Sequence, residues 1–145
     1  MTRDNLQKRK LNKPLNCVFC SEPETVDHLF FHCIVAVNIW KKVSSFLGFD
    51  VGTDLLSVVR FWLSNKKHCA TNTICAAVLW CIWKHRNALI FDNQSWLSLK
   101  QIWWLILRTV RKWKLLFPDH LLASTDCFSQ SVLCTLQELP ALPWG

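Results

Sequence analysis

The chain has 145 residues, 51% of them hydrophobic and 19% charged, with a formal net charge of +7. Its length suits one domain, or a small domain with an appendage, and its composition excludes an intrinsically disordered chain. Three glycines and no tyrosine, beside many Leu, Ala, Lys and Trp residues, favour helices over a hairpin-rich β fold.

The first 16 residues are predicted to form a basic N-terminal arm. Five basic residues stand there against one acidic residue, and they are Arg3, Lys8, Arg9, Lys10 and Lys13. Positive charge attracts polyanions, either nucleic acid or an anionic membrane face. The opening is polar and lacks the apolar segment of a secretory signal. The longest apolar run, at residues 74–83, is about half the length of a transmembrane helix. We therefore expect a soluble, intracellular protein without a membrane partner.

Four residues have the spacing of a zinc site, Cys-x2-Cys-x7-His-x4-Cys, and they are Cys17, Cys20, His28 and Cys33. Cysteines stay reduced inside cells, so a cluster of them indicates a metal more than disulfides. Three thiolates and one imidazole would complete a tetrahedron around zinc with no open position, as in a structural site. The acidic residues Glu22 and Glu24 are expected to keep the loop solvated.

Two other interpretations of the cysteines fit less well. Cysteine often packs in a core as a small hydrophobe. That suits Cys75 and Cys81, which recur at helical spacing, but not Cys17 and Cys20, which lie in a polar loop. A redox Cys-x2-Cys pair belongs to a strand–helix context, and we see no strand signal here.

The fourth ligand is ambiguous on spacing alone. His28 and His32 are four residues apart and share a face of a regular helix, whereas His28 and Cys33 diverge by about 140°. His32 could therefore replace Cys33. If His28 lies in an irregular first turn, Cys33 becomes the ligand, and Cys33 also lies on an apolar stripe with Phe30 and Val37.

A first helix is predicted to follow the cluster, so that residues 17–47 form a zinc knuckle plus this helix. Thr25 can cap its start, and Asp27 lies in the first turn, where the helix dipole favours negative charge. Apolar residues recur every three or four positions from His28 onward, and Gly48 is a suitable stop.

Further helices are predicted at residues 54–64, 70–91 and 96–117, the last closed by Pro118. Together they form a helical region at residues 54–117, followed by a weakly structured tail at residues 118–145. The sequence thus predicts a mainly α fold, in which a small Cys/His zinc knuckle leads into a bundle of about four to five helices.

The helix predicted at residues 70–91 is apolar on all sides near its middle, which indicates a central and buried position. We expect it to bury Trp80 or Trp83. His85 falls on its apolar side and is expected to be a core histidine with its hydrogen bonds satisfied rather than a metal ligand.

The helix predicted at residues 96–117 has two different faces. Its apolar stripe consists of Leu99, Trp103, Ile106, Val110, Trp113 and Phe117. The opposite face carries Lys100, Trp104, Arg108, Arg111 and Lys112, and no acidic residue occurs from 93 to 118. Cations can neutralise phosphates and a ring can stack on a base. For this helix alone, a solvated face with Trp104 covered by another segment is the favoured interpretation, and the stripe could also be a dimer seam.

Two stretches of the chain resemble a known family. The first reads Cys17-x2-Cys20, then Glu24-Thr25-x2-His28-Leu29-Phe30-x2-Cys33, then Ile39-Trp40. It resembles the zinc-binding domain that follows reverse transcriptase in plant non-LTR (LINE-type) retrotransposon proteins. The second, Trp80-x-Ile82-Trp83-Lys84-x-Arg86-Asn87-x3-Phe91, resembles the helical segment downstream in the same polyproteins. The resemblance implies Cys17, Cys20, His28 and Cys33 as ligands, which favours Cys33 over His32.

The predicted function is a structural zinc-binding module of a retroelement reverse transcriptase-like protein that assists nucleic-acid binding. Its partner would be RNA or single-stranded DNA, held by the basic arm together with Arg108, Arg111 and Lys112. No enzyme activity is predicted, because the chain lacks a Tyr-x-Asp-Asp polymerase signature and a four-carboxylate set for RNase H. The alternatives are an interaction module, whose Trp-rich helices dock a polymerase domain or a second copy, and a degenerate fragment without activity.

Overall fold

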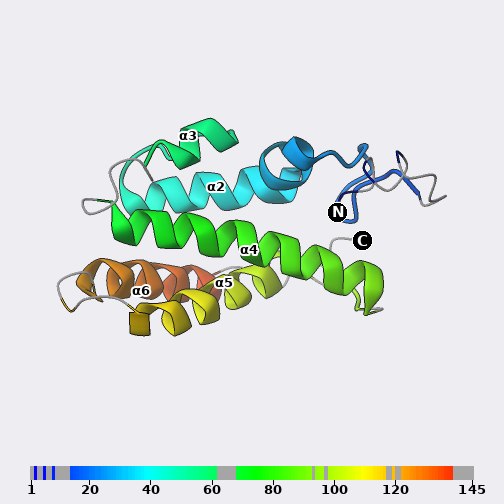
Figure 1. The fold of residues 1–145 in the computed structure, drawn as a ribbon. Coiled ribbons are helices and arrows are strands. Elements are labelled where there is room, and N and C mark those ends of the chain that lie inside the picture. Colours follow the sequence, from blue (N-terminus) through cyan, green and yellow to red (C-terminus); the bar gives the residue numbers. More distant parts are fainter. Residues whose placement is uncertain are drawn as a thin grey trace.

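The protein is built from helices, as the computed structural model in Figure 1 shows. The structure describes residues 2, 5, 8, 14–61, 68–92, 94–96, 98–116, 119 and 122–138. The elements are η1 (His28–His32), α2 (Ile34–Leu47), α3 (Leu55–Val59), α4 (Cys69–Phe91), α5 (Leu99–Trp113), η3 (Lys114–Leu116) and α6 (Leu122–Glu138). Within these ranges there is no β-strand, and one isolated bridge joins Asn16 to Pro23. The predicted mainly helical fold is confirmed.

Part of the predicted basic arm lies outside the described residues. That part comprises Arg3, Arg9, Lys10 and Lys13, whereas Lys8 is described and exposed.

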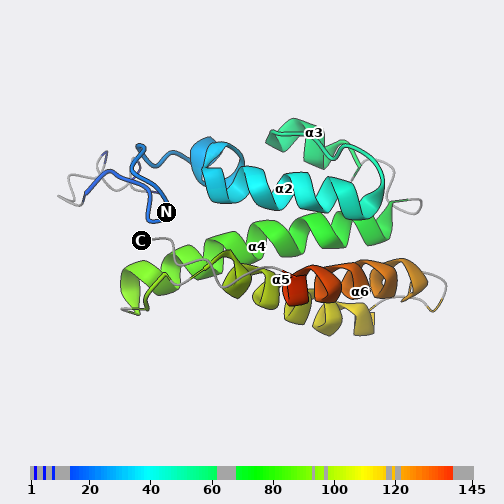
Figure 2. The ribbon, with the colours of Figure 1, turned by 180° about the vertical axis from the view of Figure 1, so that it is seen from behind.

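Helix α4 is the centre of the molecule. Figure 1 shows α2 and α3 on one side of it and α5 and α6 on the other, and the view from behind in Figure 2 gives the same order. It contacts η1, α2, α3, α5 and α6. By length and composition alone α4 could cross a membrane. Its place among five packed elements is that of the core helix of a bundle, which is consistent with a soluble protein.

The expectation that the middle of α4 is buried all round is wrong for one side. Ile74, Val78, Cys81 and Ile82 are buried, and Trp83 is half-buried against the core. Trp80, however, is 50% exposed. The turn around Trp80 faces a hollow between α4 and α5 rather than another helix, so the tryptophan stays in solvent.

Local chemistry explains where the helices begin and end. Gly48 closes α2 with a left-handed φ of 75°, and its N–H donates to the Ser44 carbonyl at 3.0 Å. Asp54 caps α3 by accepting from the Ser57 N–H at 2.9 Å, and the Ser57 hydrogen bonds lower the pKa of this exposed carboxyl. Helix α3 ends at Val59, and the Arg60 N–H after it donates to the Leu56 carbonyl at 3.1 Å. Residues 62–64 of the predicted helix lie outside the described residues.

Helix α5 begins at Leu99, three residues later than predicted. Ser98 before it is fully extended, with φ −171° and ψ 160°. Trp96 is not helical and instead makes ring contacts with Phe19 and His85. The packing of this tryptophan against the knuckle therefore takes precedence over the helical pattern.

The predicted weakly structured tail is wrong for residues 122–138, which form α6. Phe128, Val132 and Leu136 are buried at helical spacing, and Phe128 packs edge-on against Phe46 of α2. Small polar residues on the same buried side, such as Ser129, interrupt the apolar stripe in the sequence. The helix forms because α2 and α5 cover it, and local propensity contributes little.

Candidate metal centre

A short hairpin turn presents the first two cysteines. The Cys17 N–H donates to the Glu22 carbonyl at 2.8 Å, and the Glu24 N–H donates to the Leu15 carbonyl at 2.9 Å. These bonds close the loop around the Cys-x2-Cys segment. The Phe19 N–H also points at the Cys17 Sγ, at 3.5 Å. The hairpin therefore fixes both thiols on one side of a small turn.

A turn of π-helix brings the other two residues to the same place. The His28 N–H donates to the Thr25 Oγ1 at 3.0 Å, so Thr25 caps the turn as the sequence predicted. The Cys33 N–H then donates to the His28 carbonyl at 2.6 Å, five residues back. This wider turn holds one residue more than an α-helical turn, so Cys33 comes round beneath His28 instead of diverging from it.

The helix breaks at Cys33 before α2 begins. Cys33 has an extended ψ of 140°, so Ile34 cannot continue the hydrogen bonding of the π-turn. The Phe30 carbonyl is satisfied instead by the Trp40 Nε1–H at 2.7 Å. Trp40 therefore locks the irregular turn in place from the next helix.

The four donor atoms form a compact cluster with the dimensions of a zinc tetrahedron. The Sγ atoms of Cys17 and Cys33 are 3.9 Å apart, and those of Cys33 and Cys20 are 3.8 Å apart. The Cys20 Sγ lies 3.2 Å from the His28 Nε2, and all four donors lie within 4.8 Å of one another. Zinc–sulfur bonds of about 2.3 Å in a tetrahedron place sulfurs about 3.8 Å apart. Disulfide sulfurs lie only about 2.05 Å apart, so these are separate thiols.

The cluster fits zinc in its chemistry as well as its size. Its donor set is three sulfurs and one imidazole nitrogen, which is a set found in closed structural zinc sites. Cys17 and Cys33 are buried, while Cys20 and His28 are half-buried. A zinc ion held by all four would have no open position for a substrate.

In the structure Cys33, and not His32, is the fourth member of the cluster, a choice that the spacing alone left open. His32 is exposed and lies outside the cluster, whereas Cys33 is fully buried inside it. The π-turn is the physical reason, because it rotates the fifth residue after His28 inward and leaves the fourth outside.

The three thiols of the cluster differ in their pKa values. The hydrogen bond from the Cys33 thiol lowers the pKa of Cys17 to about 5. The same contact and burial raise the pKa of Cys33, and burial raises the pKa of Cys20. One thiolate is therefore stabilised by a neighbouring thiol. A metal cation would do the same for all three, since cysteine binds metal as thiolate.

Glu24 does not keep the loop solvated, contrary to the sequence-based expectation. It is 1% exposed and makes a two-armed ion pair with the fully buried Arg86 of α4. The Arg86 Nη2 lies 2.5 Å from the Glu24 Oε1, and the Nε lies 3.2 Å from the Oε2. Arg86 also lies over the Trp83 ring, with its Cζ 5.5 Å from the ring centroid.

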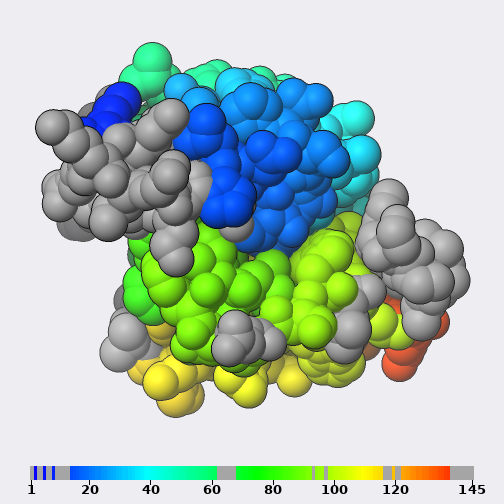
Figure 3. All heavy atoms as spheres, turned by 90° about the vertical axis from the view of Figure 1, so that its right-hand side faces the viewer, coloured from blue at the N-terminus to red at the C-terminus, as the bar shows by residue number. Residues whose placement is uncertain are grey.

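This ion pair joins two segments that are 62 positions apart in the sequence. Glu24 belongs to the loop between Cys20 and His28, and Arg86 belongs to the later turns of α4. Figure 3 shows the knuckle segment lying directly on this part of α4. Sequence reasoning missed the pair, although an arginine inside an apolar helix is a signal that a buried acid lies opposite it.

A cluster of rings supports the other side of the knuckle. His85 stacks on Phe19 at a centroid distance of 6.1 Å with an interplanar angle of 7°, and its ring lies 5.4 Å from Trp96. His85 is a core residue, as predicted, but its Nε2 is buried without a hydrogen-bond partner among the described residues. Burial lowers its pKa, so the neutral ring is favoured.

Cys75 and Cys81 of α4 behave as core residues, in agreement with the sequence. Burial raises the pKa of Cys75 to about 12 and that of Cys81 to about 11. The Cys81 Sγ lies 3.3 Å from the Thr109 Oγ1 of α5. Neither residue belongs to the four-residue cluster.

The predicted nucleic-acid residues of α5 lie on the surface. Arg108, Arg111 and Lys112 are exposed, and the opposite stripe is buried at Trp103, Ile106 and Val110. Trp104 is 50% exposed, so the expectation that another segment covers it is wrong. The apolar stripe packs on α4 and α6 within the chain, which leaves its buried residues unavailable as a dimer seam.

Comparison with known families agrees with this site. The sequence model of a family described as zinc-binding in reverse transcriptase matches residues 1–40. The matched segment contains all four residues of the cluster and ends at Trp40, which locks the π-turn. Comparisons with curated proteins and with solved structures gave no match. The match thus agrees with the first resemblance noted in the sequence over residues 1–40, while the second stretch lies outside the matched residues and plant origin stays a prediction.

Proposed function

We propose that this chain is a zinc-ordered module that assists the binding of RNA or single-stranded DNA by a reverse transcriptase-like protein. The observation that carries the zinc part is the four-donor cluster of Cys17, Cys20, His28 and Cys33, with the spacing of a zinc tetrahedron. The matched family is a zinc-binding module and not a catalytic domain. When bound, zinc would supply structure here, because four protein ligands leave no position for a reacting water.

The role of the metal would be to hold the knuckle on the bundle. Without it, the loop between residues 17 and 33 is held by a few hairpin bonds, the π-turn, the Glu24–Arg86 pair and the ring contacts of Phe19. Binding free energy at a structural zinc site is folding free energy, because the unfolded chain has no preformed site. Zinc would therefore fix the direction in which the preceding basic arm leaves the knuckle.

The charge distribution supports the nucleic-acid part of the proposal. The net charge is +7, and no acidic residue occurs between positions 93 and 118. On α5, Arg108, Arg111 and Lys112 face solvent. When such cations contact phosphates, counterions are released from the nucleic acid, and the resulting binding has no strong sequence preference.

A protein-interaction module is the second candidate, and the half-exposed Trp80 and Trp104 favour it. Tryptophan is enriched at the centres of protein interfaces. In this reading, the basic surface would be a solvated rim, and the partner would be a polymerase domain or a second copy. The eight free cysteines support an intracellular site for either function, because thiols stay reduced there.

One set of measurements on the purified chain tests the proposal. Elemental analysis should find about one zinc per chain, and single changes Cys17→Ala, Cys20→Ala, His28→Ala or Cys33→Ala should lower that content. Cys75→Ala is the matched control, because Cys75 is buried but lies outside the cluster. Full zinc content in Cys33→Ala, lost only when His32 is also replaced, would move the fourth ligand to His32.

Nucleic-acid binding is tested on the same sample. The zinc-loaded chain should bind a single-stranded oligonucleotide, and its affinity should fall as the salt concentration rises. A plot of log affinity against log salt concentration should have a slope of about −0.7 for each neutralised phosphate. Replacing Lys8, Arg9 and Lys10 by Gln should flatten that slope by roughly 2 units if all three touch phosphate. Undetectable binding at low salt would leave the interaction module as the better account.

A further inference from the structure

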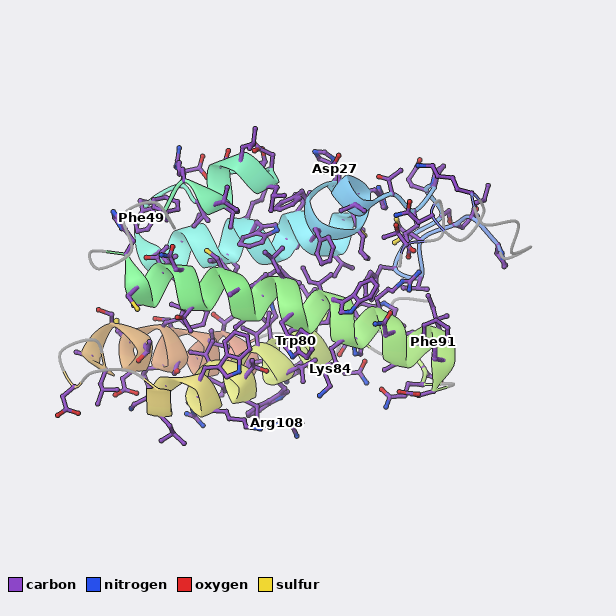
Figure 4. The ribbon with its side chains drawn as sticks, viewed as in Figure 1. Asp27, Phe49, Trp80, Lys84, Phe91 and Arg108 are labelled. Carbon is purple, nitrogen blue, oxygen red and sulfur yellow. The ribbon has the colours of Figure 1, made fainter. Side chains whose placement is uncertain are left out.

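Two half-exposed tryptophans line neighbouring hollows of the surface. Trp80 of α4 and Trp104 of α5 are each 50% exposed. Figure 4 shows Trp80 and Lys84 of α4 on the same side as Arg108 of α5. Exposed tryptophan is unusual on a solvated face, because its large ring loses most by staying in water.

A groove runs along α5, and one part of it lies between α5 and α4. One hollow of about 560 Å³ is lined by residues that include Trp80, Lys84 and Arg108, and a second of about 460 Å³ is lined by residues that include Trp104, Arg108 and Arg111. The two share Gln101, Leu105 and Arg108, so they are parts of one groove. We call this the α4–α5 groove.

The groove has a positive lining. Lys84, Arg108 and Arg111 contribute cations, and Asp92 contributes the carboxylate at the far end of α4. Across the described part of the chain, the ion pairs are those of Arg86 with Glu24 and of Lys114 with Asp126, so the groove cations are not neutralised by protein carboxylates. Lys112 lies one helical turn beyond Arg108 and is exposed as well.

We propose that the α4–α5 groove binds a single-stranded nucleic acid, with bases stacked on Trp80 and Trp104 and phosphates neutralised by Lys84, Arg108 and Arg111. This inference rests on the proposed function and adds to it the place and chemistry of binding. Aromatic rings inside a basic groove are the usual means of holding single strands without reading their sequence. A duplex fits less well, since its bases are stacked on one another and unavailable to the two rings.

Other occupants match the groove less well. A second copy placed symmetrically would bring Lys84 and Arg108 of both chains together, and like charges across an interface are costly. A membrane-surface helix needs its apolar face free to enter lipid. The apolar face of α5 is already buried at Ile102, Trp103 and Ile106.

The test uses the zinc-loaded full chain and two fluorescent probes. One is a single-stranded DNA of 12 nucleotides, and the other is the same backbone with abasic sites in place of all bases. Trp80→Leu and Trp104→Leu should each weaken binding of the first probe by about fivefold or more, because one stacked base is worth at least about that factor. Neither change should affect the abasic probe, and Trp80→Phe and Trp104→Phe should retain most of the binding.

The charge variant should behave differently from the ring variants. Replacing Lys84, Arg108 and Arg111 together by Gln should weaken both probes and flatten the salt slope by roughly 2 units. Phe91→Leu and Lys41→Gln are matched controls, because both residues are exposed and lie outside the groove. Unchanged circular dichroism spectra and urea unfolding midpoints would show that each variant is folded. We expect this result because the substituted side chains are exposed or half-exposed.

The outcomes separate this inference from the proposed function. If every groove variant binds like wild type while the arm variant at Lys8, Arg9 and Lys10 loses binding, the groove is refuted and the proposed function stands. If neither probe binds at low salt, both are refuted. The groove is also refuted if its variants change only the sedimentation mass, which indicates a second copy, or only the binding of anionic lipid vesicles, which indicates a membrane.

Discussion

The buried pair of Glu24 and Arg86 gives the sharpest prediction about how the knuckle is held. Both side chains have no exposed surface, and they meet through two charge-assisted hydrogen bonds. Removing one partner leaves the other charge buried without the two hydrogen bonds of this ion pair, and breaking a buried pair in this way costs about 3–5 kcal/mol. We therefore expect Glu24→Gln and Arg86→Met each to lower the free energy of unfolding by about that amount. At about 2–4 °C per kcal/mol for a chain of this size, the melting temperature should fall by roughly 6–20 °C.

The measurement is urea unfolding of the zinc-loaded chain, followed by circular dichroism, with a double variant to isolate the pair. Glu24→Met with Arg86→Met leaves no buried charge, so its loss should be smaller than the sum of the two single losses. Asp126→Asn is the matched control. Asp126 is 55% exposed where it meets Lys114, and an exposed pair contributes less than about 1 kcal/mol.

The same variants test whether the pair positions the metal site. Glu24 is four residues after Cys20 and four before His28, so loosening it should let the donors move apart. In competition with a chromogenic chelator, Glu24→Gln and Arg86→Met should release zinc at lower chelator concentrations than wild type and Asp126→Asn. The reasoning is refuted if Glu24→Gln unfolds within about 0.5 kcal/mol of wild type, the range of an ordinary surface change. If the variants lose the expected stability but retain zinc as well as wild type does, the pair stabilises the helical bundle without positioning the metal site.

Three further predictions concern thiols, pH and the last helix. In zinc-loaded protein at pH 8, iodoacetamide should modify the exposed Cys127 and Cys134 first and leave Cys75 unmodified, because burial raises the pKa of Cys75 to about 12. Mass spectrometry after a short exposure checks this, and early modification of Cys75 would contradict its burial. Burial lowers the pKa of His85, so the unfolded state binds more protons as pH falls below about 6.5 and stability should decline there. The His85→Phe variant should lack that part of the decline in stability. Parallel profiles of stability against pH for the variant and wild type would refute this role of His85. A chain ending at residue 121 should unfold at lower urea concentration than the full chain, since it uncovers the core side chains that α6 covers; an unchanged midpoint would show that α6 adds nothing.

The sequence alone determined the parts of this protein whose chemistry is local. The spacing of the cysteines and His28 indicates a zinc site, because ligand types and short separations of this kind are those of structural zinc sites. The strong apolar periodicity of α5 and the length of α4 indicate helices within a few residues of their ends. Thr25 and Gly48 mark a start and a stop, because capping depends on a few adjacent residues.

The tertiary structure decided everything that depends on distant segments. Cys33 enters the cluster because a π-turn, locked from α2 by Trp40, overrides the regular helical wheel that would have placed His32 there. Glu24 is buried because Arg86, 62 positions away, lies opposite it. Residues 122–138 form a helix because α2 and α5 cover a stripe that its small polar residues interrupt. Trp80 and Trp104 stay half-exposed because they line surface hollows rather than a packed interface, and no pattern within either helix encodes the space beside it.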